Sequence, residues 1–237
     1  MREGGRYVAL TDDAVDGIRQ MIITGELAPG DKLPAEKELA ARLGLSRNSL
    51  REAVRALTLM RVLHTRRGDG TYVTSLDPEL LLGTMHMVVD LHHDSTVRHF
   101  LEVRRLLEPE AAAKAALSIS SDELAELDRL LDQGEKLVSG QDPDPDRRLT
   151  AENGQAFHRV IARASRNPVL ATIVETISGK TLRPHAWCGV TDRSDLHLTL
   201  SEHRAIYEAL AAGDTYRARI RAAAHVAGIE DAMLSPH

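Results

Sequence analysis

The 237-residue sequence contains one cysteine, Cys188, and no apolar run near the roughly 20 residues that a membrane-spanning helix needs. A single cysteine excludes an intramolecular disulfide framework. The N-terminal residues also lack the pattern of a signal peptide. We therefore expect a soluble protein that works in a reducing cytoplasm and has no membrane partner.

The net charge of −5 would argue against binding to nucleic acid if the charge were spread evenly along the chain. Residues 1–75 hold 12 Lys and Arg against 10 Asp and Glu, a net of +2, whereas residues 76–237 hold 18 against 25, a net of −7. Within residues 45–74, six arginines stand against two acidic residues, a net of +4. This local excess indicates a surface that can face phosphates.

A helix-turn-helix pattern follows a first amphipathic helix that we predict over residues 10–24. Residues 35–57, AEKELAARLGLSRNSLREAVRAL, predict a short helix, a tight turn at Gly44 and a second helix. Ser46 can cap the second helix by accepting a hydrogen bond from a backbone N–H near Ser49. Such a turn fixes the angle between the helices and lets the second one enter a major groove by its N-terminal end.

An alternating pattern replaces the helical one over residues 62–66, and a Gly-containing turn at 68–70 precedes a second extended stretch at 71–74. We predict a two-stranded hairpin, or wing, with Arg66 and Arg67 near its tip. Arg67 at the turn is the candidate for entering a minor groove, and the alternative is a solvated hairpin end.

The chain after the hairpin shows no strand signal, so the fold class is mainly α: an N-terminal winged helix-turn-helix with three helices and a two-stranded wing, then an all-α bundle of six or seven helices. We place a DNA-binding domain at residues 1–75 and an effector-binding and dimerisation domain at 76–237, with a linker at 75–79. The predicted bundle helices are 80–91, 96–117, 122–139, 148–165, 168–182, 195–212 and 215–233.

The motifs resemble a known family. The segments GELAPGDKLPAEKELAARLGLSRNSLREAVRAL and RRGDGTYV, within residues 21–73, are similar to the DNA-binding domain of GntR-family transcriptional regulators. FLEVRRLLEPEAAAKAA, AFHRVIARASRNPVL and SEHRAIYEALAAGD resemble the effector-binding FCD domain of the FadR subfamily. The resemblance implies a homodimer that binds an inverted-repeat operator of double-stranded DNA, usually as a repressor released by a small organic acid.

The same resemblance assigns DNA contacts by motif position to Lys37, Ser46, Arg47, Asn48, Ser49 and Arg51, and to Arg67 and Gly68 in the wing. The residues themselves agree with it. Arg47 and Arg51 lie one helical turn apart, and either can make a bidentate contact to guanine worth roughly 1–3 kcal/mol. Ser46, Asn48 and Ser49 are short donors suited to phosphates. Arg55, one turn further, suits a solvated or intramolecular role.

Three histidines, His158, His203 and His225, fall on three different predicted helices in apolar or small-residue settings. In the resembled domain such histidines converge on a divalent metal, commonly zinc or nickel, with an aspartate one turn before the first histidine. That position is Gly154 here. Three interpretations stay open: a three-histidine metal site completed by water or an effector carboxylate, a metal-free pocket that binds an acid directly, and core histidines without a ligand.

Arg104 matches the arginine of the family's EVR motif and shares a helix face with Glu108. Its acid partner is either Glu108, as a structural ion pair, or the carboxylate of an effector, which the resemblance favours. The segment 183–187, which holds the single tryptophan, is a candidate cap of the same pocket.

A ligand-responsive transcription factor rather than an enzyme is the function we expect. The main alternative is a metal-dependent helical-bundle enzyme, since buried histidines and a metal can activate water. Against it, no paired carboxylates or positioned nucleophile accompany the histidines in the sequence. A nucleoid-type DNA binder is a third option, which the large helical domain disfavours.

Overall fold

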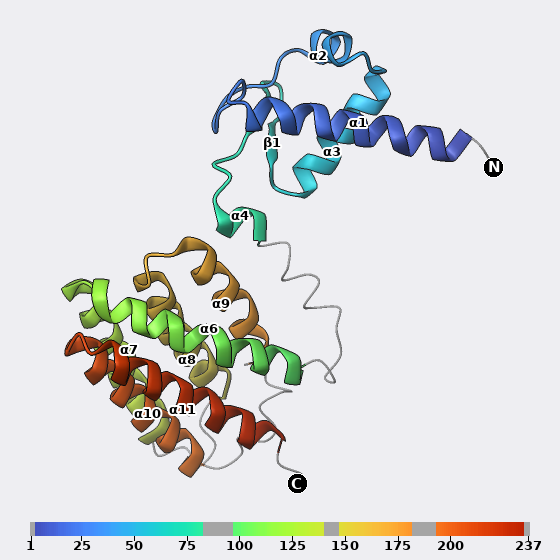
Figure 1. The fold of residues 1–237 in the computed structure, drawn as a ribbon. Helices are drawn as coiled ribbons and strands as arrows, with labels where there is room; N and C mark the ends of the chain where they lie inside the picture. Colours follow the sequence, from blue (N-terminus) through green and yellow to red (C-terminus); the bar gives the residue numbers. More distant parts are fainter. Residues whose placement is uncertain (1–2, 83–96, 140–146, 182–192, 235–237) are drawn as a thin grey trace. The chain divides into compact units, whose positions relative to one another are not determined.

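The computed structural model describes residues 3–82, 97–139, 147–181 and 193–234 (Figure 1). The chain divides into two compact units, residues 1–84 and 85–237. This division lies after the short helix α4 (Pro78–Leu82), which occupies part of the predicted linker. Most of the predicted helix 80–91 and the segment 183–187 lie outside the described residues. Among the described helices, none has the length and apolarity to cross a membrane.

The first unit is a winged helix-turn-helix, as predicted. Its elements are α1 (Glu3–Ile23), α2 (Glu36–Leu43), α3 (Arg47–Leu59), β1 (Leu63–Arg66) and β2 (Gly70–Val73). The helix α1 begins earlier than the predicted start at residue 10. An apolar period reflects the part of a helix that packs on a core, so it does not mark where the helical backbone begins.

The core of this unit fixes α3 against the wing. Leu50 and Leu57 of α3 are buried together with Ile18 of α1, Leu63 of β1 and Val73 of β2. The two strands pair antiparallel, with Leu63 opposite Val73, so that one buried residue from each strand faces the core. The wing is therefore held at a set position relative to the helix that we expect to enter DNA.

The second unit is all helical in its described part, which confirms the predicted mainly α fold. Figure 1 shows α6 and α11 side by side in this bundle. Its core holds buried side chains from several helices, including Leu131 of α7, Phe157 of α8 and Ile206 of α10. The helices are α6 (Val97–Ser118), α7 (Ser121–Ser139), α8 (Arg147–Ala164), α9 (Pro168–Thr181), α10 (Arg193–Ala211) and α11 (Thr215–Leu234).

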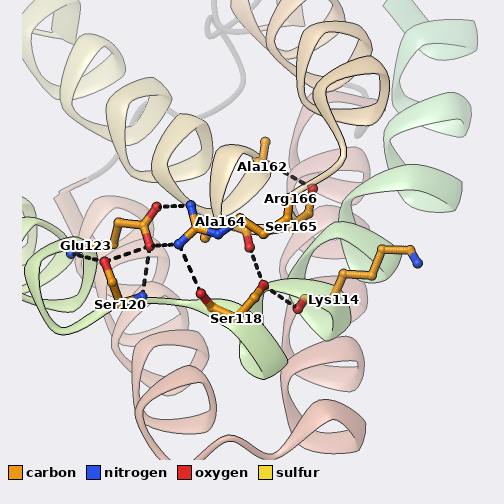
Figure 2. Close-up of polar contacts among 8 residues, drawn as sticks. All are labelled: Lys114, Ser118, Ser120, Glu123, Ala162, Ala164, Ser165 and Arg166. Atoms are coloured by element: carbon orange, nitrogen blue, oxygen red, sulfur yellow. Dashed lines mark hydrogen bonds and ion pairs between the residues drawn. The ribbon is translucent and has the colours of Figure 1, made fainter.

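An arginine clasp joins three helix ends of the bundle. Figure 2 shows Arg166, just beyond α8, donating to both carboxylate oxygens of Glu123 at 2.8 and 2.6 Å and to the carbonyl of Ser118 at 3.0 Å. The Glu123 carboxylate also accepts from the backbone N–H of Ser120 at 2.8 Å, as in a capping box at the start of α7. The clasp fixes the ends of α6 and α8 against the start of α7.

Candidate DNA interface and buried histidine site

Ser46 caps α3, as predicted. Its backbone is extended, and its Oγ accepts a hydrogen bond from the Ser49 backbone N–H at 3.0 Å. Arg47 and Asn48, the first two helical residues, are exposed, and so is Ser46. The start of a helix that is exposed and carries donors is suited to contact phosphates and base edges.

Ser49 differs from its neighbours because the structure buries it. It is 1% exposed, and its Oγ lies 3.0 Å from Ser46 Oγ, so that its hydroxyl supports the cap. Because the Ser49 hydroxyl is buried, it is not placed to make the predicted direct contact to a phosphate. We therefore assign Ser49 to the cap and leave it out of the proposed DNA contacts.

The basic side chains around α3 are exposed but differ in their partners. Arg51 pairs with Glu36 of α2 at 2.9 Å, and Arg55 pairs with Glu52 at 2.7 Å. The second pair confirms the intramolecular role expected for Arg55. Lys37 on α2 is exposed. Arg51 meets Glu36 through Nε, whereas Arg47 has no ion pair among the described residues.

The wing tip has its own polar network, which the sequence pattern did not indicate. Asp69 accepts from the Tyr72 hydroxyl at 2.6 Å and from Lys32 at 3.0 Å. These contacts, with that of Tyr72 the largest, lower the pKa of Asp69. Arg66 lies over the Tyr72 ring at 4.6 Å, while Arg67 is exposed at the turn. The exposed turn position supports Arg67, rather than Arg66, as the candidate for DNA.

Gly68, beside Arg67, is exposed with φ +79°. This is the left-handed region, where glycine adopts the turn without the steric cost of a Cβ atom.

The three predicted histidines converge inside the second unit. His158 on α8, His203 on α10 and His225 on α11 are 8%, 3% and 1% exposed. The Nε2 atom of His225 lies 3.1 Å from Nε2 of His158 and 3.3 Å from Nε2 of His203. The Phe157 ring stacks on His203 with the ring centroids 4.4 Å apart. We call these three residues the histidine triad.

Two carboxylates contact the Nδ1 atoms of two of the three histidines. Glu202 lies 2.8 Å from Nδ1 of His225, and Glu108 lies 3.3 Å from Nδ1 of His158. A carboxylate accepts, so each contact favours a proton on Nδ1 and leaves Nε2 with a lone pair. Two lone pairs 3.1 Å apart repel each other unless a proton or a metal ion lies between them. The sequence analysis did not identify Glu202. Glu202 directly precedes His203 in the chain, and this position does not indicate that its carboxylate contacts His225 on another helix.

Glu108 is the centre of a buried polar network. Its Oε1 accepts from Nε of Arg104 at 2.5 Å and from Oγ of Ser178 at 2.9 Å. Burial alone would raise the pKa of Glu108, but the charge and hydrogen bond of Arg104 lower it overall. Of the two alternatives for Arg104, the structure shows the ion pair with Glu108. A contact between Arg104 and an effector stays a prediction.

The donor set of the triad fits a divalent transition metal. Burial, followed by the positive charge of nearby groups, lowers the pKa of His158 and of His203 well below 6.5, so both are neutral near pH 7. Neutral imidazole nitrogens are ligands for zinc and nickel. Four ligands at a typical Zn–N distance would lie about 3.3 Å from one another, close to the separations of the Nε2 atoms. The triad could therefore hold a metal ion, as the spacing of its ligand atoms also indicates.

A cavity of about 20 Å³ adjoins the triad, which is room for about one water molecule. Leu196, Leu200 and Ile229 supply apolar lining, while Gly154 and Asn153 border it from α8. The Asn153 side chain donates to the carbonyl of Leu130 at 3.0 Å. The sequence had placed in doubt a carboxylate ligand from the turn of α8 that holds Gly154. Among the described residues, the group that could hold a metal consists of the three histidines and includes no carboxylate.

The fold and these two sites define a winged helix-turn-helix DNA-binding protein with a helical regulatory domain. Residues 10–73 match the model of the family "Bacterial regulatory proteins, gntR family", and residues 99–228 match that of the "FCD domain". The chain therefore belongs to the GntR family, in the FadR subfamily that carries an FCD domain. This is a family of transcriptional regulators, which decides against the metal-dependent enzyme.

Sequence relatives align with this chain along most of its length. The chain is 31% identical over 218 residues to the HTH-type transcriptional regulator LutR of Bacillus subtilis, covering 90% of this chain and 96% of LutR. It is 30% identical over 205 residues to the galactonate operon transcriptional repressor of Escherichia coli, covering 84% and 86%. A solved structure, Streptococcus agalactiae GntR, is 27% identical with a TM-score of 0.65, covering 93% of this chain and 98% of that one.

Proposed function

We propose that this regulator binds an inverted-repeat operator as a homodimer in the cytoplasm, where the DNA is, and represses transcription until a small organic acid binds its helical domain. The Escherichia coli relative is named as the repressor of a galactonate operon, which supports both the repressor role and the acid class. A two-fold dimer matches the symmetry of an inverted repeat, because each recognition helix reads one half-site.

The proposed DNA contacts divide into base readout, phosphate contacts and the wing. Arg47, which has no ion pair among the described residues, is the main candidate for a bidentate contact to guanine, and Arg51, which is exposed beside Glu36, is the second. Ser46, Asn48 and Lys37 supply phosphate contacts from exposed positions at the start of α3 and on α2. Arg67, with Gly68 at the turn, is proposed for the minor groove.

Homodimer formation is proposed through the helical unit. Leu106 and Leu117 of α6 and Tyr216 of α11 are 73%, 77% and 71% exposed, although their side chains are large and apolar. Exposed large apolar side chains on adjacent helices favour contact with another protein surface. A second copy of the chain is the partner that the family resemblance implies.

The effector is proposed to bind beside the triad, where the cavity, which now has room for about one water molecule, must widen to admit it. A divalent metal, zinc or nickel, is proposed to be held by His158, His203 and His225. The observation that carries this proposal is the convergence of the Nε2 atoms at 3.1 and 3.3 Å while carboxylates occupy two of the Nδ1 atoms. A bound metal would supply positive charge to attract a carboxylate. Glu108 and Glu202 orient the imidazoles, and Arg104 holds Glu108 in place.

DNA recognition is tested with Arg47→Ala and a matched control, Arg55→Ala. The operator is first selected from a random duplex library with the wild-type protein. We expect Arg47→Ala to abolish operator binding in a gel-shift assay while the protein remains a folded dimer by sedimentation, and Arg55→Ala to bind as wild type. An Arg47→Ala variant that still shifts the palindromic operator at physiological salt contradicts the assignment.

The histidine site is tested by elemental analysis of the purified protein, together with a thermal-shift screen of sugar acids, including galactonate, and short carboxylates. A stoichiometric metal and a thermal shift by an acid are expected. An acid shift without metal would instead support the metal-free pocket. Neither metal nor any shift would favour histidines that are part of the core alone.

A further inference from the structure

The turn at the wing tip carries an acidic side chain where DNA is expected to approach. Arg67, Gly68 and Asp69 form this turn between the paired residues Arg66 and Gly70. Asp69 is exposed, and the minor groove that the wing is proposed to enter has a negative potential. Electrostatics alone therefore predicts that the Asp69 carboxylate weakens DNA binding.

Both carboxylate oxygens of Asp69 are held by other parts of the unit. Oδ2 accepts from the Tyr72 hydroxyl at 2.6 Å, and Oδ1 accepts from Nζ of Lys32 at 3.0 Å. The backbone N–H of Asp69 donates to the carbonyl of Arg66 at 3.1 Å. We call Lys32, Asp69 and Tyr72 the wing-tip network. It joins the turn to β2 and to a segment outside the hairpin.

The segment that supplies Lys32 is itself anchored along β2. Lys32 is paired antiparallel with Tyr72, and the backbone N–H of Leu33 donates to the carbonyl of Thr71 at 2.8 Å. Gly70 leaves room for the lysine, because a Cβ atom at this position would collide with Cε of Lys32. The Lys32 side chain can therefore pass over Gly70 and reach the turn from a fixed backbone.

The two neighbouring arginines of the wing differ in what holds them. Arg66 lies over the Tyr72 ring at 4.6 Å and donates from Nε to His64 at 3.3 Å. Arg67 is exposed and makes no ion pair within the part of the chain that the structure describes. Its position depends on the backbone of the turn, which Asp69 holds. A turn that is fixed before binding reduces the conformational entropy that is lost on binding.

We propose that Asp69 is a positioning residue for DNA binding: Tyr72 and Lys32 hold its carboxylate so that the turn presents Arg67 to the minor groove. Asp69 acts through Arg67 and makes no contact with DNA itself. This inference rests on the proposed function, since it assumes that Arg67 contacts the operator. The wing-tip network thus strengthens operator binding, although Asp69 carries the same sign of charge as the phosphates.

The test is a gel-shift titration of full-length protein with the selected operator at one fixed physiological salt concentration. We expect Asp69→Ala to bind about tenfold more weakly than wild type. Asp69→Asn makes the same change of charge but keeps an acceptor for the Tyr72 hydroxyl, so it should bind more tightly than Asp69→Ala. Tyr72→Phe changes no charge near pH 7 and keeps the ring under Arg66, and it should bind about threefold more weakly than wild type.

A double-mutant cycle shows whether Asp69 acts through Arg67. In an Arg67→Ala background, adding Asp69→Ala should change the operator affinity by less than about twofold, because the side chain that the turn presents is gone. A merely structural role of Asp69 would instead weaken binding equally in both backgrounds. Thermal denaturation of each variant checks that the DNA-binding unit is folded.

The outcomes separate this inference from the proposed function. If Arg67→Ala weakens operator binding while a folded Asp69→Ala binds as tightly as wild type or more tightly, the contact of Arg67 stands and the inference is wrong. Equal losses in both backgrounds also overturn the inference. An Arg67→Ala variant that binds as wild type contradicts the proposed contact of Arg67 and the inference with it. If Asp69→Ala does not fold, Tyr72→Phe in the two backgrounds decides.

Discussion

Replacing Glu202 with alanine should weaken metal binding without unfolding the protein. Glu202 accepts the hydrogen bond from Nδ1 of His225 at 2.8 Å and thereby sets which nitrogen would face the proposed metal. Loss of such an orienting partner typically costs 10–100-fold in metal affinity. Glu202 is 27% exposed, so water can partly replace its carboxylate, and we expect the low end, about tenfold or about 1.4 kcal/mol.

Glu108 is the less informative position for this experiment. It is 5% exposed and accepts from the fully buried Arg104, so its removal would leave a charge buried without its partner. That typically costs about 3–5 kcal/mol and would confuse loss of metal with loss of folding. The position of Glu202 at the edge of the site avoids this difficulty.

The assay is a competition for Zn²⁺ between metal-stripped full-length protein and a chromogenic chelator near neutral pH. Glu208→Ala, an exposed position on the same helix, is the matched control and should leave the affinity unchanged. A Glu202→Ala variant with the wild-type Kd would refute the orienting role. Equal losses in both variants would show that a general effect on α10, and not the contact with His225, is responsible.

Three further predictions concern stability. Ser46→Ala removes the cap of α3 and should lower the free energy of unfolding by about 1 kcal/mol, measured by chemical denaturation. Leu50→Ala, at a side chain that is 0% exposed, should cost about 2–5 kcal/mol, whereas Leu59→Ala, at one that is 78% exposed, should change stability by no more than about 0.5 kcal/mol. In the metal-free protein, burial lowers the pKa of His158 and His203, so below pH 6.5 the unfolded chain binds more protons. Denaturation at a series of pH values should show a constant free energy of unfolding above pH 6.5. Below pH 6.5 the free energy of unfolding should fall by about 1.4 kcal/mol per pH unit for each histidine that stays neutral in the folded protein. An equal free energy of unfolding above and below pH 6.5 would contradict the burial of these histidines as neutral groups.

The sequence predicts elements best where the apolar period is strong. The caps, turns and periods that surround Ser46 and Gly44 predict α2 and α3 correctly, and Leu63 and Val73 mark the inner face of the wing. The start of α1 was predicted too late, because its first residues follow no apolar period. Local signals thus indicate elements whose side chains pack on a core.

Of the buried site, the sequence predicted the three histidines but not the residues that contact them. His158, His203 and His225 were found through resemblance, but their spacing in the chain carries no information about convergence across three helices. The partners Glu108 and Glu202 depend on which helix faces which, a property of tertiary packing. Burial of Ser49 likewise follows from the cap geometry, not from its residue type.

An acid bound at the triad is proposed to control binding of the operator. The most direct measurement is operator affinity of zinc-loaded wild type and His203→Ala over a titration with galactonate. Galactonate should weaken the affinity of wild type, while His203→Ala should bind the operator as tightly as wild type does without acid and respond far less. An equal loss of affinity in both proteins would contradict it.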